Sequence, residues 1–360
     1  MLGRRAPPCP LVTTPYALGL LRNHSGKRNQ ESDLVLNNSS VLITGGTGSF
    51  GKAFLSRLLA DVGPDRVVIF SRDELKQYEM KATWGDDPRV RFFLGDIRDL
   101  DRLTMAMRGI DYVVHAAALK QVDTAEYNPM EFVKTNILGS ENVIQASIAN
   151  QVKKVVALST DKASSPVNLY GATKLTADKL FISSNHYVEA GGTRFAVVRY
   201  GNVMASRGSV IPLFRDLATR GEPLPITDTR MTRFWITLPQ AVQFVMDSFS
   251  DMKGGELYVP RIPSMKVVDL AAAIAPGSEL VEIGVRPGEK LHEEMIASAD
   301  APRTLERPDR YVVAPTLAMW GGYEAPAGSP VADGFSYASD NNDQWLSIDD
   351  LRMMLTELGA

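Results

Sequence analysis

Short runs of branched apolar residues alternate along this chain with stretches in which apolar residues recur every three or four positions. The runs predict buried β-strands, and the stretches between them predict amphipathic helices. Before residue 200 the runs lie at 41–44, 66–70, 89–94, 111–115, 154–158 and 193–199. Strands that alternate with helices at this spacing predict an α/β fold built on a doubly wound parallel sheet.

The alternation stops after residue 200. Segments 225–235 and 286–290 are rich in polar and basic residues instead of apolar runs. Such segments suit a lobe that grips an anionic substrate through charge-assisted hydrogen bonds. The plainer alternative is that Arg230, Arg233 and Arg286 are solvated surface residues. The end of the chain, 345–358, has the pattern of an amphipathic helix.

The first 39 residues stand apart from the rest. They combine several prolines with a polar run from Asn23 to Asp33. Arg4 and Arg5 precede an apolar stretch as in a signal peptide, but Pro10 and Pro15 interrupt it. We therefore expect residues 1–39 to be a disordered extension and assign them no function.

Composition limits the possible partners. The formal net charge is −3 and the basic residues are scattered, which argues against a nucleic-acid-binding protein. The single cysteine, Cys9, excludes an internal disulfide framework and fits a reducing compartment. No apolar run approaches the roughly 18 residues that cross a bilayer. We expect a soluble, cytoplasmic protein without a metal site.

A glycine-rich turn follows the first predicted strand at once. Gly45-Gly-Thr-Gly-Ser-Phe-Gly51 lies between that strand and a helix with Phe54 and Leu58 on its apolar side. Glycines in this context let the backbone turn sharply and approach a pyrophosphate, which then sits on the helix N-terminus. The turn therefore predicts a dinucleotide site.

The end of the second strand bears on the choice of cofactor. An acidic residue usually occupies this position in NAD sites, where it binds the ribose 2′-hydroxyl. Here Ser71 and Arg72 occur, with Lys76 one turn later, and these suit the 2′-phosphate of NADP. Asp73 is a competing acid. We favour NADP over NAD.

Small and polar residues end the third and fourth strands. Gly95-Asp96-Ile97 is a plausible edge around an adenine, and Ala116-Ala-Ala118 would let the backbone approach the cofactor. His115, at the end of the fourth strand, is interpreted as a packed core histidine rather than a ligand.

Tyr170 and Lys174 form a possible acid/base unit. Four residues apart, they would share one face of a helix. A nearby ammonium stabilises a phenolate, so the pKa of Tyr170 would fall toward the working pH. Tyr-x-x-x-Lys also arises by chance on exposed helix faces. The glycine turn upstream favours the functional interpretation.

Taken together, these motifs resemble the extended short-chain dehydrogenases/reductases that act on nucleotide sugars. Within them the chain is most similar to the inverting UDP-N-acetylglucosamine 4,6-dehydratases of pseudaminic acid biosynthesis and flagellin glycosylation. The similarity covers about residues 40 to 315. It rests on the glycine turn, on Tyr170-x-x-x-Lys174, on Ser159-Thr-Asp-Lys-Ala163 and on segments 70–77, 115–120, 125–129, 199–203, 226–235 and 286–292.

The resemblance implies a Rossmann-type NADP-binding domain, from 40–200 and 232–262, and a smaller, discontinuous α/β substrate-binding lobe, from 201–231 and 263–360. It also implies a homo-oligomer, a dimer or hexamer assembled through Rossmann helices. The sequence departs from the family at Gln121 and Asp123, where His and Pro are common, which bears on substrate fit near Lys120.

The resemblance further implies the reaction and its residues. The C4 hydroxyl is oxidised by NADP⁺, water is eliminated across C5 and C6, and hydride returns to C6 with inversion at C5. The expected catalytic residues are Thr160, to orient the C4 hydroxyl, Asp161, protonated to help the C6 hydroxyl leave, Lys162, the C5 base if neutral, Tyr170 and Lys174. The expected cofactor contacts are Gly45, Thr47, Gly48, Ser49, Phe50, Gly51, Ser71, Arg72, Lys76, Asp96, Ile97, Ala116, Lys120, Tyr170, Lys174 and Val203. The expected contacts to the substrate, UDP-N-acetylglucosamine, are Lys120, Thr160, Tyr170, Asn202, Arg286 and Glu289.

Two other functions stay open. A nucleotide-sugar 4-epimerase would share the glycine turn and the Tyr170/Lys174 unit, but epimerisation needs no elimination pair such as Asp161 and Lys162. A non-catalytic NADP-binding regulator on the same scaffold would have no need of Tyr170 and Lys174.

Overall fold

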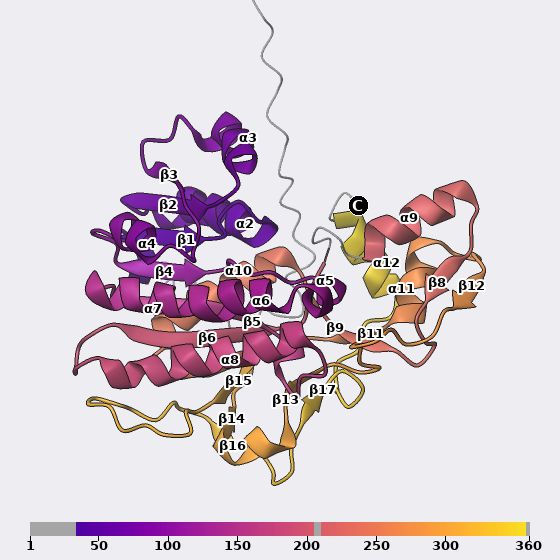
Figure 1. Ribbon diagram of the computed structural model, residues 1–360. Coiled ribbons are helices and arrows are strands. Elements are labelled where there is room, and N and C mark those ends of the chain that lie inside the picture. The colour runs from indigo at the N-terminus through magenta and orange to yellow at the C-terminus, as the bar shows by residue number, and fades with distance from the viewer. Residues whose placement is uncertain (1–33, 205–209, 358–360) are drawn as a thin grey trace, which may run out of the picture.

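A ten-stranded sheet runs through the computed structural model, which describes residues 34–204 and 210–357 (Figure 1). Its strand order is β16-β14-β15-β10-β6-β5-β4-β1-β2-β3. The strands are β1 (Ser40–Thr44), β2 (Arg66–Ser71), β3 (Val90–Leu94), β4 (Tyr112–His115), β5 (Lys154–Thr160), β6 (Arg194–Tyr200), β10 (Leu257–Pro260), β14 (Thr304–Glu306), β15 (Arg310–Val313) and β16 (Ser329–Pro330).

From β3 to β10 every pairing in this sheet is parallel. The order reverses between β1 and β4, so the chain winds outward in both directions from that point. In such sheets ligands bind beyond the carboxyl ends of the strands, at the reversal. Register places Thr44 beside both Phe70 and His115, which aligns these carboxyl ends.

Helices cover both faces of the parallel strands (Figure 1). One layer contains α4, α7 and α8, which pack side by side, and α2 packs against α10 in the other. The helices of this part are α2 (Ser49–Arg57), α3 (Glu74–Trp84), α4 (Leu100–Ala106), α5 (Val122–Tyr127), α6 (Pro129–Phe132), α7 (Gly139–Ala149), α8 (Leu169–Ser183) and α10 (Leu238–Asp251), with π-helical turns at Leu58–Val62 and Val133–Leu138 and 3₁₀ turns at Asp161–Ala163, Ser184–Tyr187 and Ser298–Arg303.

The strands read as nearly continuous apolar runs because both faces of the sheet are covered. Val41, Leu42 and Ile43 in β1 are fully buried, as are Val155 and Val156 in β5. The observed strands agree with the six predicted runs to within one or two residues. The α/β class and the doubly wound parallel sheet are confirmed.

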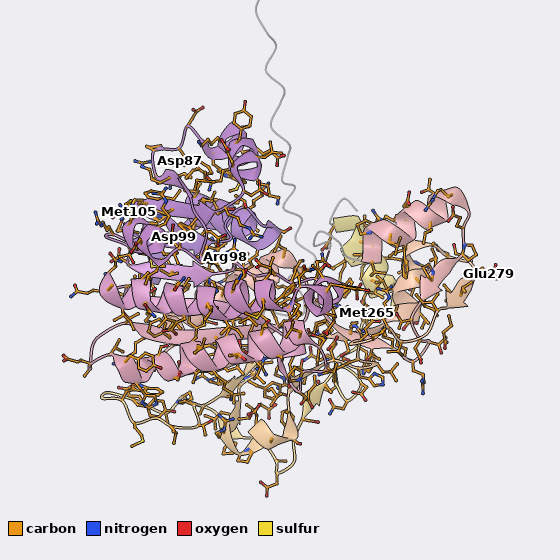
Figure 2. The ribbon with its side chains drawn as sticks, viewed as in Figure 1. Asp87, Arg98, Asp99, Met105, Met265 and Glu279 are labelled. Atoms are coloured by element: carbon orange, nitrogen blue, oxygen red, sulfur yellow. The ribbon has the colours of Figure 1, made fainter. Side chains whose placement is uncertain are left out.

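Smaller sheets and helices form a lobe beside the carboxyl ends of the parallel strands (Figure 1). Its elements are β7 (Asn202–Val203), α9 (Val210–Arg220), β8 (Leu224–Ile226), β9 (Thr232–Ile236), β11 (Ser264–Lys266), α11 (Val267–Ile274), β12 (Leu280–Glu282) and α12 (Ile348–Glu357). The short strands β13 (Glu294–Ile296) and β17 (Tyr337–Ala338) pair with each other and pack against the main core. Figure 2 shows Met265 near the junction with the main sheet and Glu279 at the far side of the lobe. The lobe has its own apolar clusters, one of which contains Met265, Leu270 and Leu351.

Two details differ from the expected boundaries. Strands β14, β15 and β16 extend the large sheet in antiparallel fashion beyond β10, although they fall within the range 263–360 expected for the lobe. Residues 34–39, expected to be disordered, are ordered: Leu36 is fully buried in the main core and its carbonyl accepts a hydrogen bond from Ser39. Residues 1–33 of that expected extension lie outside the described residues.

Within the described ranges, no helix is long and apolar enough to cross a membrane.

Candidate active site

A cavity of about 1010 Å³ lies between the carboxyl ends of the parallel strands and the lobe. It is lined by every residue predicted above to bind cofactor or substrate, and by Thr160, Lys162, Tyr170 and Lys174 among the predicted catalytic residues. Asp161 is not part of the lining; it is buried directly behind Lys162. The sequence-predicted residues are thus brought together in one place.

The glycine turn forms the wall of the cavity beside β1. Gly45 has a φ of +65°, and a Cβ atom there would lie 2.8 Å from the main chain of Ala117. A Cβ on Gly51 would lie 2.4 Å from the carbonyl oxygen of Gly46. Only glycine therefore fits either position.

The turn ends in a helix, α2, for which the described part of the chain shows no side-chain cap. Gly48 is the N-cap of α2 and makes no side-chain capping bond, and the first turn carries no acidic residue. Free N–H groups and a positive helix end facing a cavity suit a pyrophosphate. The chain therefore fits a dinucleotide here.

The end of β2 carries the residues predicted to choose the cofactor. Ser71 shares a 2.8 Å hydrogen bond with the hydroxyl of Thr47 in the glycine turn. Asp73, the competing acid, is the N-cap of α3 and accepts a hydrogen bond from the N–H of Lys76. Arg72 lies 3.8 Å from Asp96 and is half exposed. Asp73 and Arg72 thus both line the cavity, and each is paired within the chain, Asp73 with Lys76 and Arg72 with Asp96.

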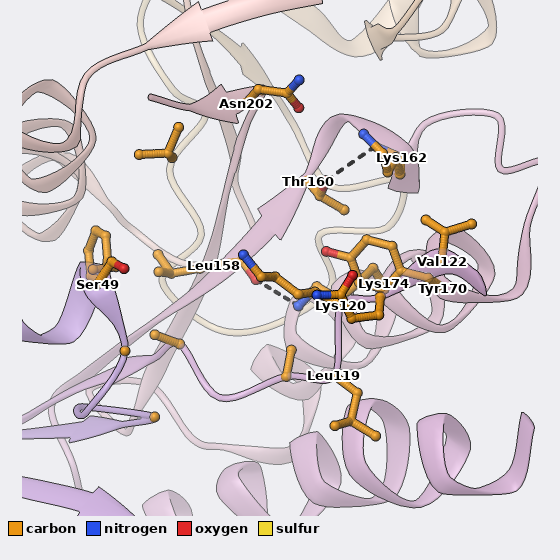
Figure 3. A pocket seen from close by; sticks show the side chains of 18 of the residues that line it. Ser49, Leu119, Lys120, Val122, Leu158, Thr160, Lys162, Tyr170, Lys174 and Asn202 are labelled. Atoms are coloured by element: carbon orange, nitrogen blue, oxygen red, sulfur yellow. Dashed lines mark hydrogen bonds between the residues drawn. The ribbon is translucent and has the colours of Figure 1, made fainter. Parts of the chain in front are cut away.

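Tyr170 and Lys174 lie in α8, one turn apart, and are buried (Figure 3). Asn168 caps this helix by accepting a hydrogen bond from the N–H of Gly171. Lys174 donates a 2.7 Å hydrogen bond from Nζ to the carbonyl oxygen of Leu158. Burial lowers the pKa of Lys174, and Asp178 partly opposes this.

The electrostatics of Tyr170 differ from expectation. Burial raises the pKa of Tyr170 to about 12, while the charge of Lys162 and a hydrogen bond with Thr160 act to lower it. Lys162 is the cation with the largest lowering effect on this pKa, and Lys174 donates to the main chain of β5. Burial outweighs the lowering effects, so the pKa of Tyr170 is raised rather than lowered as expected.

Lys162 lies between two buried carboxylates. Its Nζ is 3.1 Å from Oδ1 of Asp161 and 3.0 Å from Oε1 of Glu293. Burial alone would lower the pKa of Lys162, but Asp161 and Glu293 outweigh it and the pKa is raised. Lys162 is thus protonated in this state, so the neutral form required of a base must arise by proton transfer. The same Oδ1 of Asp161 accepts a 2.9 Å hydrogen bond from Thr160.

His115 is a core residue, as predicted. It is 1 % exposed and bonds the hydroxyls of Thr44 and Ser140 through its two ring nitrogens. Burial, with a smaller contribution from Lys174, lowers its pKa to about 3. His115 is therefore neutral at physiological pH.

The lobe contributes the predicted nucleotide-binding residues. Asn202 in β7, Arg286 and Glu289 line the cavity. Arg233 also lines it; it is 6 % exposed and lies 3.7 Å from Glu289. Arg230 instead projects into solvent and pairs with Asp228. The alternative of solvated surface arginines thus holds for Arg230 but not for Arg233, and Arg286 is exposed at the edge of the cavity that it lines.

Sequence reasoning missed Glu293. It lies 131 positions after Lys162, and no motif or spacing connects the two. One signal was present: in Glu293-Glu-Met-Ile296 acidic residues lead into a short apolar strand, where alternation turns one carboxylate inward. The 1 % exposure of Glu293 shows which one it is.

Segment 286–294 is bonded directly to the loop that follows the catalytic strand β5. Asn168 donates a 2.7 Å hydrogen bond to the carbonyl of Gly288, and Lys290 donates one to the carbonyl of Ser164. The hydroxyls of Ser164 and Ser165 both donate to Oε2 of Glu294. The loop carrying Lys162 and the segment carrying Arg286 therefore form one bonded unit.

Comparison with known proteins adds to this geometry. A family model described as polysaccharide biosynthesis protein matches residues 41–315. The chain is 52% identical, over 87% of its length and 96% of the relative, to a UDP-N-acetylglucosamine 4,6-dehydratase (inverting) of Campylobacter jejuni. It is 46% identical, over 72% of its length and 78% of the relative, to a UDP-glucose 4-epimerase of Rickettsia akari. Among solved structures it resembles DesIV, a dTDP-glucose 4,6-dehydratase from Streptomyces venezuelae with NAD and TYD bound, with a TM-score of 0.62 and 26% identity over 70% of this chain and 86% of that one.

Proposed function

The chain belongs to the polysaccharide biosynthesis protein family, and we propose that within it the chain is a UDP-N-acetylglucosamine 4,6-dehydratase that inverts C5. It would act as a hydro-lyase and form UDP-2-acetamido-2,6-dideoxy-beta-L-arabino-hex-4-ulose. The observation that carries this proposal is the Asp161–Lys162 ion pair, which adjoins Thr160 and Tyr170 at the same cavity. Elimination needs a base that removes the C5 proton and an acid that protonates the departing C6 hydroxyl, and both must lie beside the sugar.

The cofactor in this proposal is NADP. The glycine turn and the start of α2 would hold its pyrophosphate, and Arg72 with Lys76 would bind the 2′-phosphate. When bound, the nicotinamide supplies the acceptor for the C4 hydride and the donor that returns it to C6. No external redox partner is then needed.

Tyr170 removes the proton of the C4 hydroxyl in the proposed mechanism. Thr160 orients that hydroxyl, and the charge of Lys162 favours the phenolate. Lys174 ties α8 to β5 through its hydrogen bond to the carbonyl of Leu158, and its side chain lines the cavity. The 4-keto group so formed acidifies the proton on C5.

The elimination step uses the Asp161–Lys162 pair as one unit. Transfer of one proton from Nζ of Lys162 to Oδ1 of Asp161 gives a neutral amine and a carboxylic acid at once. The amine then takes the C5 proton. The acid passes its proton to the hydroxyl of Thr160, which bonds the same Oδ1 and lines the cavity, and Thr160 gives its own proton to the departing C6 hydroxyl, which leaves as water. Lys162 ends as ammonium and Asp161 as carboxylate, so the original pair is restored. When hydride returns to C6, Tyr170 gives the proton that it took from the C4 hydroxyl to C5 from the opposite face, which restores the phenolate and inverts C5.

The epimerase alternative has one observation in its favour, the Rickettsia akari relative. It leaves the buried Asp161–Lys162–Glu293 cluster without a chemical role, and the identity to that relative is lower and covers less of the chain. A non-catalytic regulator would leave the whole cluster unexplained. The proposal also includes a cytoplasmic location and a homo-oligomer assembled through helices of the large domain.

Proton NMR of the reaction in D₂O tests the function. Purified full-length protein with UDP-N-acetylglucosamine should give a 4-keto-6-deoxy sugar with a methyl signal at C6, deuterium at C5 and the inverted C5 configuration. Recovery of unchanged sugar, or of a C4 epimer that keeps its 6-hydroxyl, would contradict the proposal.

A further inference from the structure

Glu293 is a buried carboxylate beside Lys162, and the proposed mechanism gives it no role. Its side chain is 2 % exposed and lines the same cavity. Oε1 contacts Nζ of Lys162 at 3.0 Å and lies 3.9 Å from Nε of Arg233. Oε2 is buried and accepts no hydrogen bond from the described residues.

The backbone of Glu293 is held rigidly. Its N–H donates a 2.9 Å hydrogen bond to Oγ of Ser339, and its carbonyl accepts a 2.7 Å hydrogen bond from the N–H of the same residue. The Ser339 hydroxyl in turn shares a 2.7 Å hydrogen bond with Thr232, the residue before Arg233. The carboxylate thus projects from a backbone that two other segments fix.

The charges of Asp161, Lys162, Glu293 and Arg233 sum to zero both before and after the proton moves from Lys162 to Asp161. With Asp161 and Lys162 ionised, Glu293 and Arg233 add one negative and one positive charge. After the proton moves from Lys162 to Asp161, the buried charges left are Glu293 and Arg233, which still face each other. An ionised Glu293 therefore has a partner throughout, as a buried carboxylate requires.

We propose that Glu293 is the positioning residue for Lys162: it holds one N–H of the amine in both protonation states, so that the lone pair of neutral Lys162 is aimed at C5. This inference rests on the proposed function. A neutral amine has two N–H donors and one lone pair, and without a fixed acceptor it rotates freely. Asp161 cannot be that acceptor alone, because it changes its own protonation during the step.

Other charged groups face Glu293 and bear on the test. Asp161 and Lys162 approach from the segment after β5, Arg233 from β9, and Glu289 lies beyond Arg233. The neighbouring His292 turns toward Thr232 and Asp340. Of these groups, Lys162 is the one whose pKa Glu293 raises directly.

Two variants separate the charge of the Glu293 side chain from its reach: Glu293→Gln removes the charge and keeps the length, and Glu293→Asp keeps the charge and shortens the side chain. Both are assayed in the full chain for C4 oxidation, by the transient near-ultraviolet absorbance of reduced nicotinamide, and for elimination, by the C6 methyl signal, across a pH series. Glu293→Gln should keep C4 oxidation, slow elimination roughly tenfold to a hundredfold and move the falling, alkaline limb of the elimination profile down by about one pH unit, because Lys162 loses a neighbouring anion and gives up the proton of the pair to solvent at lower pH. Glu293→Asp should slow elimination through its shorter reach and keep the wild-type limb.

Glu294→Gln is the matched control, because its carboxylate meets serine hydroxyls rather than Lys162; it should keep the wild-type limb. If Glu293→Gln slows C4 oxidation and elimination equally and leaves the limb of the pH profile in place, the role of Glu293 is purely structural and the proposal is overturned. An elimination rate equal to that of the wild type in Glu293→Gln would overturn it as well. If the wild-type chain itself fails to dehydrate the sugar, the proposed function is overturned first, and that result is separate from either variant.

Discussion

Nζ of Lys162 lies 3.1 Å from Oδ1 of Asp161, the residue immediately before it in the chain. Adjacent residues rarely face each other in a helix or a strand, but here a 3₁₀ turn at Asp161–Ala163 follows β5 and folds one side chain back on the other. The two groups that the proposed elimination needs, one basic and one acidic, thus arise from a single proton shift.

Lys162→Ala and Asp161→Asn should therefore share the same defect in elimination. Each should bind cofactor and oxidise C4 but lose elimination by on the order of a hundredfold or more, so that reduced nicotinamide accumulates. Stopped-flow absorbance with a methyl-signal assay measures both steps. Lys162→Ala should also need a higher pH for C4 oxidation, because Lys162 is the cation that lowers the pKa of Tyr170. Continued turnover in Lys162→Ala would show that Lys162 is not the base.

The preference for NADP is expected to depend on Arg72. Arg72→Ala removes a cation at the cavity and should weaken NADP binding roughly tenfold or more, with little effect on NAD. Calorimetric titration with both dinucleotides measures the difference. Arg98→Ala is the matched control, because Arg98 pairs with the same Asp96 but does not line the cavity. Equal losses for NADP and NAD would contradict the assignment.

His115 should make the fold sensitive to mild acid. Its pKa is about 3 in the fold against an ordinary value of 6.5, so the unfolded chain binds more protons between these values. Stability then falls as pH drops through 6.5, by about 2 kcal/mol from this group between pH 7 and 5. Urea unfolding of wild type and His115→Gln at both pH values measures it. The variant should lose about 2 kcal/mol less over this interval, and equal losses would refute a neutral buried histidine.

Leu36 should stabilise the main domain although it precedes the first strand. It is fully buried, so Leu36→Ala should lower the free energy of unfolding by about 2–5 kcal/mol. Leu34 is two-thirds exposed and serves as the control, with little change expected for Leu34→Ala. Similar melting curves for both variants would count against the packing of this segment.

The sequence predicted the parts of the structure that rest on local pattern. The strands could be recognised as apolar runs. The glycine turn and the Tyr170/Lys174 pair could be recognised because their functional residues lie close together in the sequence. The residues missed depend on tertiary contact. The contact of Glu293 with Lys162 and the burial of Arg233 require the lobe to pack near the end of β5, and the raised pKa of Tyr170 depends on its burial in the folded chain.

The bonded unit formed by the loop 161–168 and segment 286–294 has a kinetic consequence. By the family resemblance, Arg286 and Glu289 hold the uridine diphosphate end of the substrate, far along the ligand from the bonds that change. Because their segment is hydrogen-bonded to the loop of Lys162, binding energy from the uridine diphosphate serves to place the base. A sugar shortened to its 1-phosphate is therefore expected to lose kcat as well as affinity.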